Sequence, residues 1–350
     1  MKLKSKDILK IGLGISIILS FDALKIEKLL KDIKIPERKL SLLNFSNIET
    51  EELKETDKIS EVVPVSIVKD KDIRNSVRYA VSLAGGLNFI KPGDIVLIKP
   101  NVNSYDPCPG TTSPEVVGEI VRMSFEQGAK RVIVADCSGI PWPNTLYNME
   151  KVGILQEAKK QGAEVLALDN TEWVFVKPKG VKYWEKGFRI PKLLQSVDHI
   201  INVAVVKTHS IADFTMSLKN FVGLIHRSDR MLMHSSRYIK EMIGELNLAF
   251  HPKLNILDAS KVFVKGGPAV GEIRTPGIII ASPDRVACDM VGLSLLKILG
   301  TTPAIQDKNM WEHPQIKRAV EVGVGIKESD NIKLLGLNVE LEKFKKRIGR

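Results

Sequence analysis

The sequence has few of the residues that build metal clusters and nucleic-acid surfaces. Its 350 residues include only three cysteines, Cys108, Cys137 and Cys288, and no Cys-x-x-Cys pair. We therefore expect no disulfide framework, no closed structural zinc site and no iron–sulfur cluster bound by this chain alone. Aromatic residues make up 6% of the chain, and the lysines are dispersed rather than grouped beside aromatics. This pattern indicates no nucleic-acid partner.

Acidic residues are also in deficit, with 41 against 52 lysines and arginines and a net charge of +11. A basic protein favours acidic partners such as anionic metabolites or a membrane surface. The alternative is a lysine-rich compositional bias of the source organism, such as a thermophile. Hydrophobic residues at 44% and charged residues at 27% are typical of a folded soluble domain.

Residues 1–35 are predicted to form a signal-like or membrane-anchoring segment. Lys2, Lys4 and Lys6 precede an apolar stretch at 11–21, which is shorter than the roughly 20 residues of a membrane-spanning helix. No small-x-small cleavage site follows, so an uncleaved anchor and a buried N-terminal helix stay open as alternatives. The polar residues 36–61 are predicted to be a linker. The chain is therefore expected to be membrane-associated or exported, with a cytoplasmic location as the alternative.

From residue 62 onward, strand-like and helix-like patterns alternate. Strands are predicted at 62–68, 94–98, 131–135, 164–168, 200–206 and 254–257, with helices between most of them. This order predicts an α/β fold, with a mostly parallel sheet that carries helices on both faces. We assign residues 62–325 to this domain and residues 326–350 to a basic C-terminal tail.

Polar side chains follow several of these predicted strands. Lys99 and Asn101 follow the second strand, and Asp136 and Ser138 follow the third. The carboxyl ends of parallel strands meet at one edge of a sheet, where such proteins bind ligands in a crevice. We therefore expect these residues to gather there.

The apolar run at 200–206, which we expect to be a central strand, breaks into Lys207, Thr208 and His209. His209 is a candidate general base or metal ligand, or else a histidine that hydrogen-bonds a neighbouring loop. Lys219 lies in a moderately apolar segment, where burial would lower its pKa and make it nucleophilic. The alternative for Lys219 is a side chain that reaches solvent. Asp289, inside an apolar helical segment, is expected to cap a loop or pair with a buried base.

Five segments resemble the domain-of-unknown-function family 362 (DUF362). They are 96–101 (VLIKPN), 203–209 (VAVVKTH), 217–223 (SLKNFVG), 266–268 (GGP) and 281–289 (ASPDRVACD). The resemblance covers roughly residues 62–325 and implies an α/β domain without an established activity.

A more distant similarity is to the nickel-pincer lactate racemase family. In that family a strand ends in Pro-His, a lysine follows ten residues later, and a further histidine comes after it. There the lysine anchors the cofactor, the later histidine ligates the metal, and the first histidine is an acid/base group. His209, Lys219 and His234 have a similar spacing. The similarity implies shared architecture and a metal- or cofactor-binding locus, and does not assign racemase activity.

Our hypothesis is a protein that binds an anionic small molecule, a metal or a metal cofactor at the carboxyl ends of the strands. The cofactor would be a divalent metal or a lysine-tethered metal cofactor. The alternative is a non-catalytic accessory protein that delivers a metal or an iron–sulfur cluster to a membrane-associated redox enzyme, with that enzyme as protein partner. The predicted catalytic residues are His209 and Lys219, and the predicted metal ligands are His209 and His234. The predicted ligand-binding residues are Lys99, Asn101, Asp136, Ser138, Lys207, Thr208 and Asn220.

Overall fold

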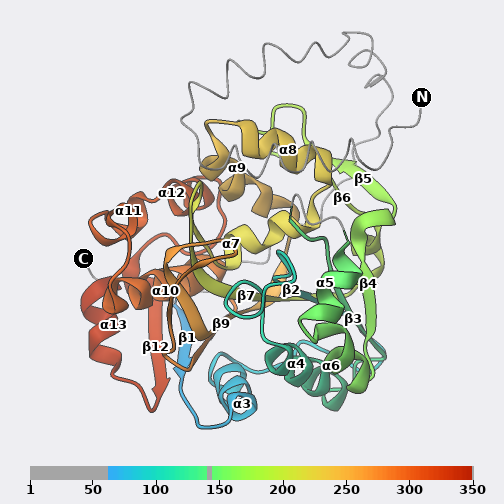
Figure 1. Ribbon diagram of the computed structural model, residues 1–350, viewed down its shortest axis with the longest axis horizontal. Coiled ribbons are helices and arrows are strands. Elements are labelled where there is room, and N and C mark those ends of the chain that lie inside the picture. Colours follow the sequence, from blue (N-terminus) through green and yellow to red (C-terminus); the bar gives the residue numbers. More distant parts are fainter. Residues whose placement is uncertain (1–61, 140–143, 349–350) are drawn as a thin grey trace. The chain divides into compact units, whose positions relative to one another are not determined.

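The computed structural model describes residues 62–139 and 144–348 (Figure 1). The expected anchor at 1–35 and linker at 36–61 lie outside the described residues. The main sheet has ten strands. Eight of them follow the order β12-β1-β11-β9-β7-β2-β3-β4, while β10 pairs with β9 and β8 pairs with β7. The strands are β1 (Val63–Val68), β2 (Ile95–Pro100), β3 (Arg131–Asp136), β4 (Glu164–Ala167), β7 (His199–His209), β8 (Asp213–Thr215), β9 (Pro252–Gly266), β10 (Gly271–Arg274), β11 (Ile278–Ser282) and β12 (Ile332–Leu337).

Most neighbouring strands in this sheet run parallel. The pairs β12/β1, β9/β7, β7/β2, β2/β3 and β3/β4 are parallel, whereas β11 is antiparallel to both β1 and β9. The mostly parallel sheet is confirmed, and β7 is one of its inner strands. A separate antiparallel pair, β5 (Trp173–Val176) and β6 (Phe188–Pro191), accounts for the segment before β7.

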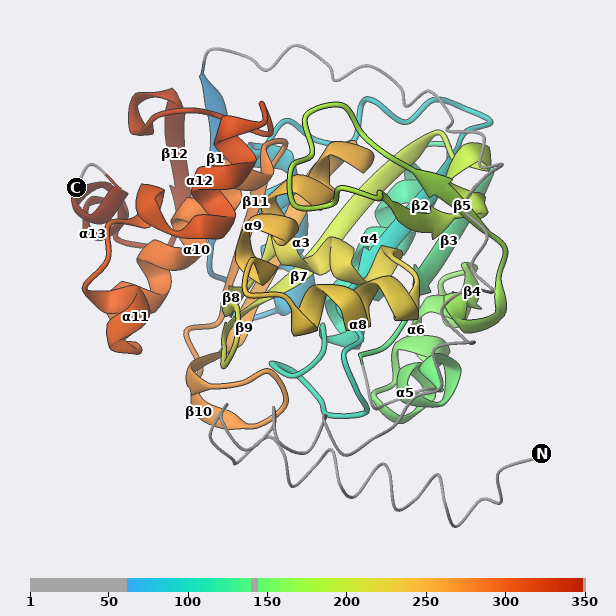
Figure 2. The same ribbon diagram turned by 90° about the horizontal axis from the view of Figure 1, so that it is seen from above.

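Two hydrophobic cores form because successive strand residues point to opposite faces of the sheet. Val96 and Ile98 of β2 pack into the core beneath α3, α4 and α6, whereas Leu97 belongs to the core on the other face. Figures 1 and 2 show α3, α4 and α6 on one face and α7, α8 and α9 on the other. The helices are α3 (Ile73–Leu83), α4 (Pro114–Glu126), α5 (Thr145–Lys151), α6 (Ile154–Lys160), α7 (Ser217–Asn220), α8 (Arg227–Ser235), α9 (Ile239–Leu246), α10 (Arg285–Leu299), α11 (Pro303–Gln306), α12 (Pro314–Glu321) and α13 (Leu341–Ile348). Helices on both faces are therefore confirmed.

The range 326–350 is not a simple basic tail. Its residues form β12, which pairs in parallel with β1, and α13, which buries Phe344 and Ile348. The sequence concealed β12 because an edge strand of partly exposed residues lacks both a continuous apolar run and clean alternation. The α/β domain therefore includes β12 and α13.

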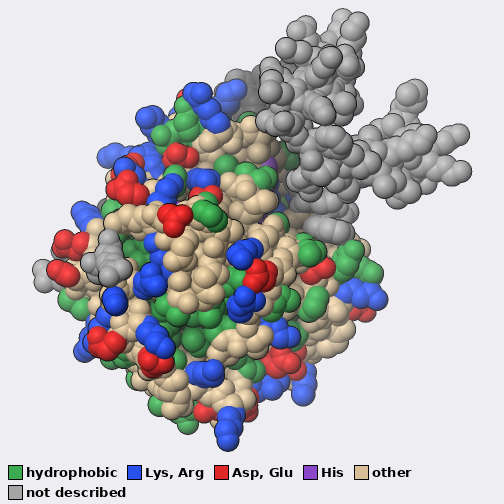
Figure 3. All heavy atoms as spheres, turned by 60° about the vertical axis from the view of Figure 1, so that its left-hand side comes forward, with side chains coloured by type: hydrophobic (Ala, Val, Ile, Leu, Met, Phe, Trp, Pro, Cys, Tyr) green, Lys and Arg blue, Asp and Glu red, His purple; other side chains and the backbone are tan. Residues whose placement is uncertain are grey.

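None of the helices within 62–139 and 144–348 is long and apolar enough to cross a membrane. On the face that Figure 3 displays, lysine and arginine side chains are interspersed with aspartate and glutamate. The positive charge does not gather into one continuous patch on that face.

Candidate functional site

The ends of β2 and β3 are joined by a buried ion pair. Lys99 Nζ lies 2.7 Å from Asp136 Oδ1, and neither side chain is more than 3% exposed. The Asp136 carboxylate also accepts hydrogen bonds from the backbone N–H groups of Val102 and Cys137, each at 2.7 Å. Burial raises the pKa of Asp136, while the charge of Lys99 and the backbone donors act in the opposite direction and favour the ionised carboxylate. Lys99 and Asp136 therefore satisfy each other, and their role is to fix the two strand ends.

This ion pair fits only because Gly223 has no side chain. A Cβ atom at this position would lie 2.1 Å from Asp136 Oδ1 and 2.6 Å from Lys99 Nζ. The backbone after α7 thus approaches the strand ends more closely than any other residue type would allow.

A chain of side-chain amides links the strands across the sheet. Lys207 Nζ donates to Asn101 Oδ1 (3.1 Å) and to the Gly110 carbonyl (2.5 Å). Asn101 then donates to Asn220 (3.1 Å), Asn220 to Asn202 (2.8 Å), and Asn202 to Asn255 (3.0 Å). Because each carboxamide is held at both ends, Asn101 presents its oxygen to Lys207.

Two lysines and one arginine form a cationic cluster. Burial, and after it the charge of Lys219, lowers the pKa of Lys207 to about 7. Burial, followed by the charge of Arg230, lowers the pKa of Lys219 to about 8. Lys219 is 8% exposed, and its ammonium has no hydrogen bond or ion pair with any described residue. The Arg230 guanidinium donates to the carbonyl groups of Ile225, Cys137, Ser138 and Gly223, so it contributes charge while tying α8 to β3.

His209, the last residue of β7, has a defined ring form. Its Nδ1 atom lies 3.2 Å from the backbone N–H groups of Ile211 and Ala212 and accepts both hydrogen bonds. Burial, then the charges of Lys219 and Lys207, lowers the pKa of His209 well below its ordinary value. The ring is therefore neutral with its proton on Nε2, a form that donates a hydrogen bond and leaves that nitrogen without a lone pair for a metal.

His234 has the complementary form. Its Nδ1 lies 2.7 Å from the carbonyl oxygen of Arg230, so Nδ1 carries the proton and donates it. Burial and the charge of Lys219 lower the pKa of His234, which keeps the ring neutral. The Nε2 lone pair is then free to accept a proton or bind a metal. Within the part of the chain that the structure describes, no three His, Cys, Asp or Glu residues are placed to hold a metal ion together.

Two predicted ligand-binding residues are occupied by structural hydrogen bonds. Thr208 Oγ1 donates to the Phe263 carbonyl at 3.3 Å, because its side chain points to the face opposite Lys207 and His209. Ser138 accepts from Asn148 Nδ2 through its hydroxyl (2.8 Å), and its N–H donates to Thr145 Oγ1 (2.8 Å). Neither side chain is hydrogen-bonded to Lys219, His209 or His234.

The segment that carries Lys219 is held by Asp289 of α10. The Asp289 carboxylate accepts from the N–H groups of Ser217 (2.7 Å) and Leu218 (3.1 Å), at the start of α7. Asp289 thus caps the polypeptide segment that positions Lys219, and the expected capping role is confirmed.

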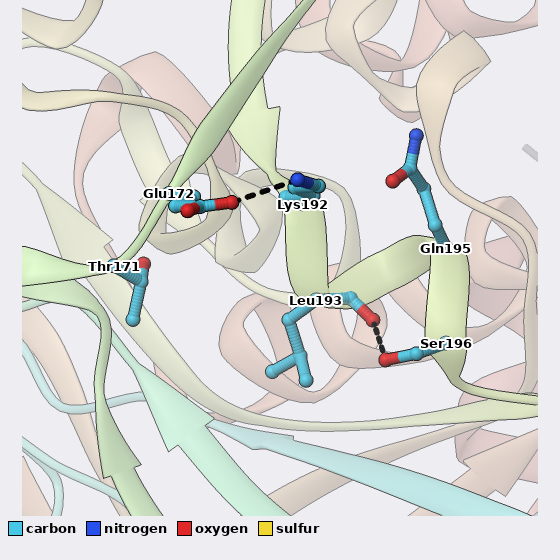
Figure 4. A pocket seen from close by; sticks show the side chains of 6 residues that line it. All are labelled: Thr171, Glu172, Lys192, Leu193, Gln195 and Ser196. Atoms are coloured by element: carbon cyan, nitrogen blue, oxygen red, sulfur yellow. Dashed lines mark hydrogen bonds and ion pairs between the residues drawn. The ribbon is translucent and has the colours of Figure 1, made fainter.

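Figure 4 shows a surface hollow that none of the residues of this cluster lines. Its volume is about 360 Å³, and it is lined by Thr171, Glu172, Lys192, Leu193, Gln195 and Ser196. Lys192 pairs with Glu172 at 2.8 Å beside it. None of the residues expected from the sequence lines this hollow, and its one lysine is already paired. We therefore place the candidate site at the cationic cluster.

Arg230 and Gly223 were not among the site residues predicted from the sequence. Arg230 and His234 are four residues apart on α8, a spacing that places them on one side of a helix, and this was an available signal. The role of Gly223 depends on the approach of Lys99 and Asp136 from distant strands, which no local pattern reveals.

A family model described as Domain of unknown function (DUF362) matches residues 96–294, which is more than half of the chain. The chain belongs to this family. A thylakoid-associated protein of Synechocystis sp. is 28% identical to this DUF362 protein over 237 residues, which cover 64% of this chain and 70% of that protein.

Two solved structures resemble the DUF362 chain at low identity. The lactate racemase apoprotein of Thermoanaerobacterium thermosaccharolyticum is 15% identical with a TM-score of 0.43, over 70% of this chain and 61% of that one. A Thermotoga maritima protein is 12% identical with a TM-score of 0.36, over 53% of this chain and 49% of that one. This chain therefore spans less than two thirds of the length of either structure.

Proposed function

We propose that the DUF362 domain binds an anionic small molecule at the carboxyl ends of β2, β3 and β7. The observation that supports this most strongly is Lys219, a nearly buried ammonium without a partner among the described residues, close to Arg230 and Lys207. A buried cation without a counter-charge destabilises a fold. A bound anion would supply the missing negative charge.

The two histidines add one hydrogen-bond donor and one acceptor to this anion site. His209 offers an Nε2–H donor, and His234 offers an Nε2 lone pair. A positive charge on His234 would lower the pKa of His209 further, so the two rings lie within electrostatic range of each other. A ligand that has an anionic group and a transferable proton could be held by the lysines and meet a hydrogen-bond donor at His209 and a base at His234.

Calorimetric titration with acetate, malonate, sulfate and inorganic phosphate tests this proposal. We expect at least one of these anions to bind the wild-type protein. Lys219→Met should abolish binding, and Lys130→Met, which removes an exposed lysine, should leave it unchanged. The proposal is refuted if no anion binds or if Lys219→Met binds as well as wild type.

The same cluster could hold a lysine-tethered metal cofactor. Lys219 would supply the amine that anchors it, and His234 would supply the neutral nitrogen that ligates the metal, which would act as a Lewis acid. His209 would then serve as donor. Intact mass and elemental analysis of natively purified protein test this half of the proposal. Extra mass that Lys219→Met removes supports it, whereas an unmodified, metal-free chain refutes it.

We also propose that the protein associates with a membrane through residues 1–35. The basic start and apolar stretch of this segment support the proposal, and so does the thylakoid association that the name of the Synechocystis relative states. Fractionation of cells that express residues 1–350 or residues 62–350 tests it. Only the longer chain should sediment with membranes, and equal distribution of the two would contradict the proposal.

A further inference from the structure

The turn between β7 and β8 supplies both hydrogen bonds that fix the His209 ring. These donors are the N–H groups of Ile211 and Ala212. Asp213, the first residue of β8, follows the three-residue turn 210–212 with φ of 66°, a left-handed conformation that aspartate adopts more readily than most residues. The positions of the donors therefore depend on the backbone path of residues 210–213.

Gln315, at the start of α12, forms hydrogen bonds with the backbone of this segment. Its side-chain nitrogen donates to the carbonyl groups of Ala212 and Phe214, the latter at 3.2 Å. The Ala212 carbonyl belongs to the peptide group directly before Asp213, and the Phe214 carbonyl to the second peptide group after it, so one carboxamide holds the backbone on both sides of the left-handed residue. Gln315 is 1% exposed, and no solvent contact competes for its donors.

The Oε1 atom of Gln315 indicates that a contribution to stability alone does not explain why glutamine occupies this position. Its Oε1 atom is buried and has no hydrogen-bond partner within the described ranges. A buried acceptor without a partner costs about 1–3 kcal/mol. The two donated hydrogen bonds are thus made at the expense of an unsatisfied oxygen.

A second contact with the same turn provides a comparison. Lys240 of α9 pairs with the Asp213 carboxylate at 2.7 and 2.8 Å. This ion pair holds the side chain of Asp213 and does not contact the carbonyl groups of the turn. Lys240 therefore binds the side chain of Asp213, whereas Gln315 binds the backbone carbonyl groups of Ala212 and Phe214.

We infer that Gln315 is a positioning residue for His209. Through the carbonyl groups of residues 212 and 214 it keeps the N–H groups of Ile211 and Ala212 directed at Nδ1. The proton then stays on Nε2, where the proposed anion would receive it as a hydrogen bond. The effect on binding rests on the proposed function, whereas the ring form of His209 can be measured without any ligand.

The test uses the full chain labelled with ¹⁵N, with the His209 ring signals assigned from a His209→Gln variant. In wild type we expect an unprotonated Nδ1, a protonated Nε2 and slow exchange of the Ile211 and Ala212 amides. Gln315→Met removes the donors at similar size. It should give a mixture of ring forms, amide exchange at least tenfold faster, and at least threefold weaker binding of sulfate.

Lys240→Met is the matched control and should leave the His209 ring form as in wild type. If Gln315→Met does not fold, Gln315→Asn, whose donor is one methylene too short, should change the ring form in the same direction. An unchanged ring form in the glutamine variants, or an equal change in Lys240→Met, overturns the inference. Wild-type protein that binds no anion would refute the proposed function while the ring measurements still decide the role of Gln315.

Discussion

Replacement of Lys219 by methionine should stabilise the fold while it removes ligand binding. Lys219 is nearly buried, and burial together with Arg230 lowers its pKa from 10.5 to about 8. Each pKa unit corresponds to about 1.4 kcal/mol of differential interaction between the two protonation states, so a shift of this size corresponds to about 3 kcal/mol. Methionine has a similar length, fills the same space and carries no charge. We therefore expect Lys219→Met to raise the free energy of unfolding by up to about 3 kcal/mol near pH 7.

The increase in the free energy of unfolding of Lys219→Met over wild type should depend on pH in a defined direction. In the unfolded chain Lys219 keeps a proton up to about pH 10.5, whereas in the folded protein it loses the proton above about pH 8. The unfolded state therefore binds more protons between these values, and the stability of wild type rises with pH in this window. Because methionine does not titrate, the advantage of the variant should be largest below pH 8 and should disappear near pH 10.5.

Urea denaturation of wild type, Lys219→Met and Lys130→Met at several pH values between 6.5 and 10 measures these differences. The Lys130→Met control should differ from wild type by less than about 0.5 kcal/mol at each pH, because its side chain is exposed. A Lys219→Met protein that is less stable than wild type at pH 7, or equally stabilised at every pH, would refute the idea of an unpaired buried ammonium.

Three further predictions concern the same cluster. Sulfate affinity should fall between pH 7 and pH 9 in calorimetric titrations, because Lys207 and Lys219 lose protons with pKa values of about 7 and about 8; affinity that is constant over this window would exclude these lysines as the anion-binding groups. Gly223→Ala should destabilise the protein by about 1–3 kcal/mol in urea denaturation, because its Cβ would displace the Lys99–Asp136 pair, and wild-type stability would contradict that geometry. Asp289→Ala should cost about 1–3 kcal/mol and weaken sulfate binding, since two N–H groups at the start of α7 lose their acceptor; unchanged binding would show that this cap does not position Lys219.

The sequence predicted the class of fold because its signals are local. The apolar run before Lys207 is long enough and rich enough in valine and isoleucine to specify a strand, and helical patterns alternate with such runs. That alternation implies parallel strands, whose carboxyl ends share one edge. The grouping of Lys99, Asp136 and Lys207 at that edge followed from this reasoning.

The roles of these residues depended on contacts between distant segments. Lys99 and Asp136 stay predicted ligand-binding residues, but their pairing with each other across two strands could not be read from the sequence. Lys219 was the more informative lysine because the folded chain leaves it without a partner among the described residues. β12 was hidden because an edge strand that is partly exposed has a weak pattern, and only its pairing with β1 defines it.

By itself, the sequence determined the strands that form β1, β2, β3, β4, β7 and β9, their alternation with helices, and the edge where polar side chains collect, but it showed neither β8 nor α8. The tertiary structure decided which charges are paired, since burial and distance set the free energy of a charge and neither can be read from neighbours in sequence. It also decided the ring forms of His209 and His234. These forms follow from backbone groups of a turn and a helix that point at one nitrogen of each ring, and that geometry exists only in the folded chain.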